Sequence, residues 1–254
     1  MLNYFHALIL GIVQGLTEWL PVSSSGHLVL FQKYFGLSVP VAFDVVLHLG
    51  TLLVVFIVFW KDILAILKSL FAWRWDDNTK LLLYLVIGSI PIAFVGFFWH
   101  DFLVGLFSSV LVVAIGLLVT GTLLYFSKLF KGVDNPNWYK TFLIGIAQSF
   151  AIIPGLSRSG ATISMGLFLG IDRRKVARFS FLLSIPAILG ATLFEFKNLV
   201  GLEVGPVIFG TVVSIFVGYF ALKFLLKLVL QNRFHYFAYY CWALGLVLLC
   251  LILF

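Results

Sequence analysis

Residues 138–170 read WYKTFLIGIAQSFAIIPGLSRSGATISMGLFLG, an apolar stretch that is interrupted near its middle by a proline and a polar cluster. The interruption starts at Pro154 and includes Ser157 and Arg158. Proline breaks helices, and serine is preferred at helix starts. The stretch is also longer than the roughly 20 residues that one membrane crossing needs. We therefore expect a re-entrant hairpin, two short helices joined by a polar turn inside the membrane.

A second stretch of the same kind lies near the start of the chain. Residues 2–35 read LNYFHALILGIVQGLTEWLPVSSSGHLVLFQKYF, with a proline and three serines at the interruption. The segment GIVQ at 11–14 recurs as GIAQ at 145–148, and SG at 25–26 recurs at 159–160. Both pairs are separated by the same offset of 134 residues (145 − 11 and 159 − 25). The sequence therefore predicts two related hairpins.

Six further apolar runs have about the length of a membrane-spanning helix. They are residues 41–60, 80–99, 106–126, 176–196, 205–226 and 236–254. The chain is 62% hydrophobic and only 11% charged, which excludes a water-soluble fold. We predict an all-α integral membrane protein, a single membrane domain over residues 1–254 with six transmembrane helices and two re-entrant helix-turn-helix hairpins.

The two hairpins divide this domain into two repeats. The first repeat, 1–126, holds the hairpin 2–35 and three spans, and the second, 138–254, holds the hairpin 138–170 and three spans. Because three is odd, the second repeat is inserted upside down relative to the first. Inverted repeats place functional sites near the middle of the membrane, where broken helices meet.

Positive charge is distributed unevenly over the predicted loops. If each hairpin returns to the side it entered, fourteen cations lie on one side, and only Lys33 and Lys197 lie on the other. The fourteen are Lys61, Lys68, Arg74, Lys80, Lys128, Lys131, Lys140, Arg173, Arg174, Lys175, Arg178, Lys223, Lys227 and Arg233. Cytoplasmic loops of membrane proteins are rich in Lys and Arg. We expect a multi-pass inner-membrane protein with both termini outside the cytoplasm, and we attribute the net charge of +7 to these loops rather than to nucleic-acid binding.

The hairpins place ionisable groups at membrane depth, where such groups are costly and usually functional. Gln14 and Glu18 are four residues apart and share a helix face, so their oxygens suit a hard divalent cation. Ser24 and His27 lie in the first turn of the returning helix. A helix N-terminus binds phosphate, and Arg158 adds a fixed fork of donors. This set of groups favours phosphoryl transfer.

At these residues the chain resembles the bacterial undecaprenyl-pyrophosphate phosphatases of the bacitracin-resistance type. QGLTE at 14–18 matches their (E/Q)xxxE element, and PGLSRSGAT at 154–162 matches PGxSRSxxT without a departure. The resemblance extends to LPVSSSGH at 20–27 and FSFLLSIP at 179–186, and it covers nearly the whole chain. One departure is Gln14, where many relatives have Glu; it weakens a model in which two carboxylates hold one metal ion.

The resemblance implies hydrolysis of undecaprenyl diphosphate to undecaprenyl phosphate, which recycles the lipid carrier for cell-wall synthesis and confers bacitracin resistance. It also implies a divalent cation (Mg²⁺ or Ca²⁺), a homodimer, and an active site that opens to the periplasmic side. The expected catalytic residues are Glu18, Ser24, His27 and Arg158. The expected substrate-binding residues are Gln14, Ser25, Ser157, Ser159 and Thr162. The expected metal ligands are Glu18 and Gln14.

Several points stay open at this stage. The nucleophile is Ser24, His27 or water. A polyprenyl-phosphate flippase or anion transporter is the alternative function, because inverted repeats with broken helices also build transporters. The SSGH at 24–27 resembles the PSGH element of another membrane phosphatase superfamily, but the preceding KxxxxxxRP element is absent. Asp44 and His48 are expected to form a mutually satisfied structural pair, and Glu195 is expected at the surface.

Overall fold

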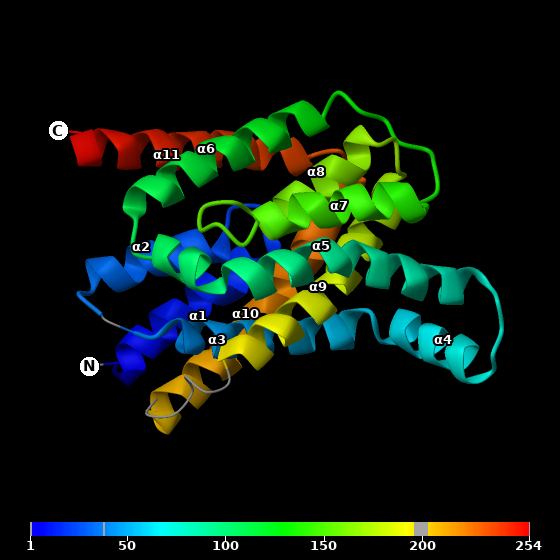
Figure 1. Ribbon diagram of the computed structural model, residues 1–254. Coiled ribbons are helices and arrows are strands. Elements are labelled where there is room, and N and C mark those ends of the chain that lie inside the picture. The colour runs from blue at the N-terminus through cyan, green and yellow to red at the C-terminus, as the bar shows by residue number, and fades with distance from the viewer. Residues whose placement is uncertain (1, 38, 196–202, 254) are drawn as a thin grey trace.

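The computed structural model describes residues 2–37, 39–195 and 203–253, and within these ranges the chain is almost entirely helical (Figure 1). The elements are α1 (Tyr4–Trp19), α2 (Ser24–Tyr34), α3 (Val41–Val58), α4 (Trp60–Phe71), α5 (Asp77–Leu106), α6 (Val110–Ser127), α7 (Trp138–Phe150), α8 (Arg158–Phe168), α9 (Arg173–Glu195), α10 (Val204–Leu230), the 3₁₀ turn η2 (Phe234–Tyr236) and α11 (Phe237–Leu253). An isolated bridge joins Asp134 and Ile171. The predicted all-α class is confirmed.

Six segments have the length and apolar character of membrane-spanning helices, as predicted. They are α3, α5, α6, α9, α10 and the segment Phe234–Leu253. The predicted run 80–99 was too short, because α5 continues past the polar pair His100-Asp101 to Leu106. Helix α5 is also kinked at Trp99, whose φ of −123° and ψ of 19° are not helical. Residues 196 and 254, two predicted span ends, lie outside the described residues.

The helices of the two hairpins are shorter than the spans. Helices α1 and α2 have 16 and 11 residues, and α7 and α8 have 13 and 11. At about 1.5 Å per residue even α1 is only about 24 Å long. That is less than the roughly 30 Å hydrocarbon core of a bilayer. These lengths support the re-entrant arrangement, which stays a prediction.

Helix α4 was not predicted. Its sequence WKDILAILKSLF is amphipathic and follows α3 almost without a break. The sequence of this stretch resembles a polar loop after a span, because it contains the charged residues Lys61, Asp62 and Lys68. In Figure 1, α4 projects from the end of the bundle opposite the two chain termini.

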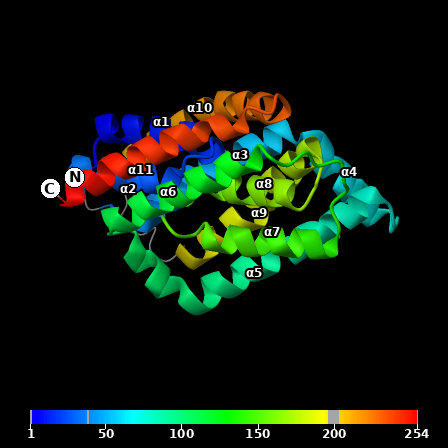
Figure 2. The same ribbon diagram turned by 90° about the horizontal axis from the view of Figure 1, so that it is seen from above.

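The helices of the two halves pack in matching pairs. Helix α1 packs along α10, α7 packs along α5, and α3 packs against α9. Figure 2 shows α1 and α10 on one side of the bundle and α5 and α7 on the other. Glycines allow the helices of both outer pairs to approach closely. A Cβ on Gly11 of α1 would lie 2.4 Å from the Gly210 carbonyl oxygen of α10. A Cβ on Gly145 of α7 would lie 2.3 Å from the Gly88 carbonyl oxygen of α5. The matched pairs support the inverted repeat, whose bounds 1–126 and 138–254 stay a prediction.

The tips of the two hairpins are joined to each other by hydrogen bonds. Ser23, which has a φ of 69°, accepts the Gly155 N–H at 3.0 Å from the second tip. Ser159 donates to the Trp19 carbonyl oxygen at 3.0 Å. Thr120 of α6 donates to the Gly155 carbonyl oxygen, also at 3.0 Å. The fold therefore fixes the two polar interruptions of the sequence side by side.

Candidate active site

A cavity of about 530 Å³ lies beside the joined tips. Both hairpins and α3 contribute to its polar lining, which includes Glu18, Ser24, Ser25, His48, Gln148, Ser157 and Arg158. Ser89, His100 and Glu195 add polar groups from α5 and α9. Much of the remaining wall is apolar and belongs to α5 and α9, including Ile92, Ala93, Gly96, Ala187, Gly190 and Ala191. The cavity thus combines a polar region with an apolar one.

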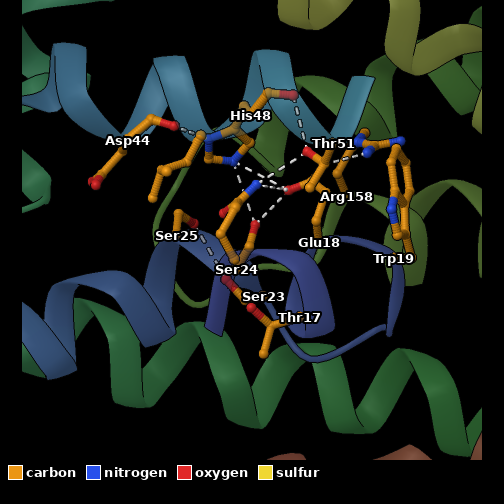
Figure 3. A network of polar contacts seen from close by, with 12 residues as sticks. Thr17, Glu18, Trp19, Ser23, Ser24, Ser25, Asp44, His48, Thr51 and Arg158 are labelled. Carbon is orange, nitrogen blue, oxygen red and sulfur yellow. Dashed lines mark hydrogen bonds and ion pairs between the residues drawn. The ribbon is translucent and has the colours of Figure 1, made fainter. Parts of the chain in front are cut away.

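Glu18 is the centre of the polar network (Figure 3). It lies at the end of α1 and is 7% exposed. Its Oε1 accepts a hydrogen bond from Arg158 Nη2 at 2.5 Å. Its Oε2 accepts from Ser24 Oγ at 2.7 Å and from Gln14 Nε2 at 3.2 Å. The structure therefore brings Gln14, Glu18, Ser24 and Arg158 together across the two hairpins, while their catalytic and binding roles stay predictions.

Ser24 is the first residue of α2, where the helix presents unpaired N–H groups. Ser23 caps this helix by accepting the Gly26 N–H at 3.2 Å. Ser25 also lines the cavity. The Ser24 hydroxyl therefore combines a carboxylate acceptor with a helix N-terminus that favours anions.

Arg158 occupies the corresponding place in the second hairpin, as the first residue of α8. Ser157, which lines the cavity, caps that helix by accepting the Gly160 N–H at 3.1 Å. The guanidinium lies 5.5 Å from the centre of the Trp19 ring, within range of a cation–π contact. Its buried Nη1 has no hydrogen-bond partner among the described residues. Arg158 thus holds Glu18 with one nitrogen and retains another donor for an anion.

His48 of α3 was missed as a member of this network. Its Nε2 lies 3.1 Å from Glu18 Oε2, and its Nδ1 lies 2.6 Å from the Asp44 backbone carbonyl oxygen. A carbonyl oxygen only accepts, so Nδ1 must carry a proton. Nε2 faces the Glu18 carboxylate and, at 3.5 Å, the Ser24 hydroxyl. His48 therefore belongs to the same polar network as Glu18 and Ser24.

The expectation that Asp44 and His48 satisfy each other is wrong, because His48 also contacts Glu18 and Asp44 also contacts Gln32. The Asp44 carboxylate accepts from Gln32 Nε2 at 2.6 Å, and only the Asp44 backbone contacts the imidazole. No sequence signal indicates a contact between α1 and α3 at these positions. The one available hint was a histidine within an apolar span, where ionisable groups are usually functional.

His27, a predicted catalytic residue, points elsewhere. It is not among the residues that line the cavity. Its Nδ1 lies 2.8 Å from the Ser23 carbonyl oxygen, and its Nε2 lies 2.7 Å from the Tyr240 hydroxyl of α11. A neutral imidazole satisfies both contacts, with Nδ1–H donating and Nε2 accepting. Helical spacing from Ser24 indicated a shared face, but the ring instead stacks on Tyr240. The geometry supports a role in holding the start of α2.

Three predicted substrate-binding residues, Gln14, Ser159 and Thr162, also lie outside the cavity lining. Ser159 is used by the hydrogen bond to the Trp19 carbonyl oxygen. Thr162 Oγ1 lies 2.8 Å from the Arg158 carbonyl oxygen and 2.6 Å from Ser180 Oγ. These hydroxyls hold the second tip and the first turn of α8 in place, so the geometry does not support direct contact with substrate.

The expected surface position of Glu195 is wrong. Its side chain is buried, lines the cavity and lies 3.0 Å from His100 Nε2. The predicted span end at 196 suggested exposure, but α5 and α9 pack against each other here.

The predicted metal ligands fit a cation in part. Glu18 lines the cavity, and its carboxylate suits a hard divalent ion. Gln14 Oε1 is buried and has no hydrogen-bond partner among the described residues, but Gln14 directs its Nε2 at Glu18 and does not line the cavity. The described residues contain no group of three or more His, Cys, Asp or Glu side chains that could hold a metal ion. A cation here would need further oxygens from the substrate.

Comparisons with known proteins identify the family of the chain. A family model described as bacitracin resistance protein BacA matches residues 7–247. A protein of Halothermothrix orenii named undecaprenyl-diphosphatase is 43% identical and aligns over 98% of both chains. A protein of Desulfosudis oleivorans with the same name is 47% identical, over 94% of this chain and 95% of the relative. Since these matches span almost the whole sequence, the chain belongs to the BacA family of bacitracin resistance proteins.

Proposed function

We propose that this protein is a membrane-embedded undecaprenyl-diphosphatase, which removes the distal phosphate of undecaprenyl diphosphate and thereby recycles the lipid carrier. The observation that supports this activity most strongly is the Glu18 carboxylate, which contacts the Ser24 hydroxyl at 2.7 Å and the Arg158 guanidinium at 2.5 Å inside one cavity. A nucleophile, a proton acceptor and a phosphate-binding cation are thus adjacent.

In the proposed reaction, Ser24 Oγ attacks the distal phosphorus and passes its proton to Glu18. The new bond joins Oγ to phosphorus, and the bond that breaks joins phosphorus to the bridging oxygen, which leaves on undecaprenyl phosphate. Water then hydrolyses the phosphoserine and releases inorganic phosphate, with Glu18 returning the proton to Ser24. Attack by water in place of Ser24 is the competing route, and both use Glu18 as the proton acceptor.

Arg158 and His48 supply positive charge around the reacting phosphate. In the structure both contact Glu18. Phosphate oxygens compete for the same donors, and Arg158 Nη1 is already unpaired among the described residues. A phosphate oxygen bound at Nη1 leaves the contact between Nη2 and Glu18 in place. Arg158 therefore holds the phosphate beside the carboxylate that accepts the proton.

The apolar wall of the cavity suits the polyprenyl chain. It is formed by α5 and α9, where Gly96 and Gly190 leave open space, since an added Cβ would meet no atom within 4 Å at either position. An isoprenoid chain buries apolar surface here while its headgroup stays at the hairpin tips. The same cavity thus accommodates both ends of an amphipathic substrate.

A divalent cation is the proposed cofactor, held by Glu18 and by Gln14 Oε1. Such an ion neutralises charge on the diphosphate. We expect EDTA to silence the purified protein and added Mg²⁺ or Ca²⁺ to restore it. Undiminished phosphate release in EDTA would remove the cation from the proposal.

The proposal includes the membrane, the oligomeric state and the orientation of the enzyme. We place the protein in the bacterial inner membrane as a homodimer, with both termini outside and the cavity accessible from the periplasmic side. Support for this orientation comes from the basic α4–α5 and α6–α7 loops, which lie at the end of the bundle that carries α4 (Figure 1). The orientation fits a substrate whose diphosphate is exposed on the outer leaflet.

The decisive test is release of inorganic phosphate from undecaprenyl diphosphate by the purified protein. Glu18→Gln and Ser24→Ala are each expected to lower turnover at least about 100-fold, a typical loss for a proton acceptor or nucleophile. Asp62→Asn is the matched control, because it removes a carboxylate from a different arginine pair, with Arg178 Nη2 at 2.7 Å. That variant should keep wild-type turnover.

A flippase would behave differently. Reconstituted into liposomes, it would move labelled polyprenyl phosphate between leaflets without releasing phosphate. That outcome would contradict the proposed function, whereas full phosphatase activity in both Glu18→Gln and Ser24→Ala would contradict the catalytic roles of these two residues.

A further inference from the structure

Gln148 has a buried amide that faces the cavity and lacks a partner. It lies in the last turn of α7, is 0% exposed and lines the cavity. Neither its Nε2 nor its Oε1 has a hydrogen-bond partner among the described residues. Buried polar groups in proteins are nearly always hydrogen-bonded, so an amide in this position calls for an explanation.

The corresponding residue of the first hairpin, Gln14, has hydrogen-bond partners that Gln148 lacks. Gln14 lies 134 positions earlier, and its Nε2 contacts both Glu18 Oε2 at 3.2 Å and Thr51 Oγ1 at 3.3 Å. Four residues after Gln148 the chain has Ile152 in place of a carboxylate, and Ile152 also lines the cavity. The same amide position is therefore partnered inside the protein in one hairpin and directed at the cavity in the other.

We propose that Gln148 is a headgroup-binding residue, whose Nε2–H group donates to a diphosphate oxygen of the substrate. This inference rests on the proposed phosphatase function. Phosphate oxygens only accept hydrogen bonds, so the amide nitrogen is the atom that binds. Arg158 Nη1, in the same cavity wall, is another unpartnered donor of this hairpin among the described residues. In this proposal, Glu18 and Ser24 of the first hairpin take part in the reaction. Gln148 and Arg158 of the second hairpin bind the diphosphate.

The test compares two kinds of buried, unpartnered polar group. Gln148→Met keeps the length of the side chain and removes its donors. Ser164→Ala is the matched control, because Ser164 Oγ is also buried without a partner among the described residues but does not line the cavity. Both variants should melt at or above the wild-type Tm, since each removes a buried unsatisfied group. Only Gln148→Met should raise KM for undecaprenyl diphosphate, by about 10- to 100-fold, as expected for a lost hydrogen bond to a charged group.

A second variant guards against misfolding. Gln148→Glu keeps the shape and replaces the NH₂ donor by an anionic oxygen, so KM should rise further than in Gln148→Met. An unchanged KM in either folded variant would overturn the assignment and indicate that the amide meets only water. A loss of turnover that follows a lowered Tm in both variants would also overturn it, because Gln148 would then be structural.

Binding is measured separately from turnover to distinguish this inference from the proposed function. A non-hydrolysable polyprenyl methylene-bisphosphonate should raise the Tm of wild type and of Ser164→Ala, and raise that of Gln148→Met much less. If wild type released no phosphate yet showed this pattern, the phosphatase proposal would fail while Gln148 kept its binding role. Equal shifts in all three proteins would reject Gln148 alone.

Discussion

Equivalent positions of the two hairpins carry different chemical groups. Ser24 and Arg158 are separated by the repeat offset of 134, and each is the first residue of a helix capped by a serine. The backbone surroundings are thus alike, with unpaired N–H groups that favour an anion at both places. One position supplies a hydroxyl and the other a cation. A diphosphate between them would contact the Ser24 hydroxyl on one side and the Arg158 guanidinium on the other.

The planar guanidinium of Arg158 should be essential for turnover. We expect Arg158→Lys to lower turnover at least about 100-fold while the protein still inserts and folds, because an ammonium cannot hold Glu18 and a phosphate oxygen in the same fixed geometry. Phosphate release and Tm are measured on the same preparations. Arg178→Lys, in the distal pair with Asp62, is the control and should keep full activity. Wild-type turnover of Arg158→Lys would remove the guanidinium from the site.

His27 should act by position and not by contact with substrate. We expect His27→Ala to lower both turnover and Tm, because it removes the links of α2 to Tyr240 and to the Ser23 carbonyl oxygen. Tyr240→Phe, which removes only the hydroxyl, should reproduce part of both losses. An inactive His27→Ala with an unchanged Tm, together with a fully active Tyr240→Phe, would instead make His27 catalytic.

The sequence identified those site residues whose chemistry contrasts with an apolar neighbourhood. Glu18 and Arg158 stand out because charge at membrane depth is costly, and their predicted meeting follows from the two related hairpins. His48 could not be placed, because its contact with Glu18 depends on how α3 crosses α1. His27 was misplaced because spacing along a helix gives a face but not the neighbour that the face meets. Tyr240 is 213 residues away and carries no signal of that contact.

At the scale of elements, the site depends on the contact between two hairpin tips. Gly155 adopts a φ of +95°, and a Cβ added there would come within 2.3 Å of the Val113 carbonyl oxygen of α6. Its N–H donates to Ser23, the cap of α2. A residue with a side chain is strained at such a φ and would also push the tip away from α6. The second hairpin therefore positions the first through this glycine.

Gly155→Ala should accordingly destabilise the protein by roughly 2–4 kcal/mol and reduce turnover by separating Ser24 from Arg158. Gly105→Ala is the control, because Gly105 is helical and exposed and an added Cβ meets no atom within 4 Å. That change should leave activity intact and leave stability unchanged or slightly higher. Denaturant or thermal unfolding in detergent measures both. Equal stability of the two variants would show that the tip contact is not needed.

At the scale of the whole molecule, hydropathy predicted the number of spans because the bilayer fixes the length of a crossing helix. It did not predict α4, since an amphipathic helix with Lys61, Asp62 and Lys68 has the composition of a loop. Nor could it show that α1 packs along α10 and α7 along α5, because those pairings are set by the close approach of glycine backbones. The sequence repeat indicated that the halves are related, while the contact between them is a property of the fold.

Orientation in the membrane gives the last prediction. The cysteines Cys241 and Cys250 are free, so a Cys241→Ala/Cys250→Ala background allows single cysteines to be labelled. Tyr34, the last residue of α2, is 83% exposed. Trp73, in the turn between α4 and α5, is 94% exposed. Because basic residues favour the cytoplasmic side, Tyr34→Cys should react with an impermeant maleimide in intact spheroplasts, and Trp73→Cys only after permeabilisation. The reverse pattern would turn the first hairpin toward the cytoplasm and would place the phosphatase on the wrong leaflet for a periplasmic substrate.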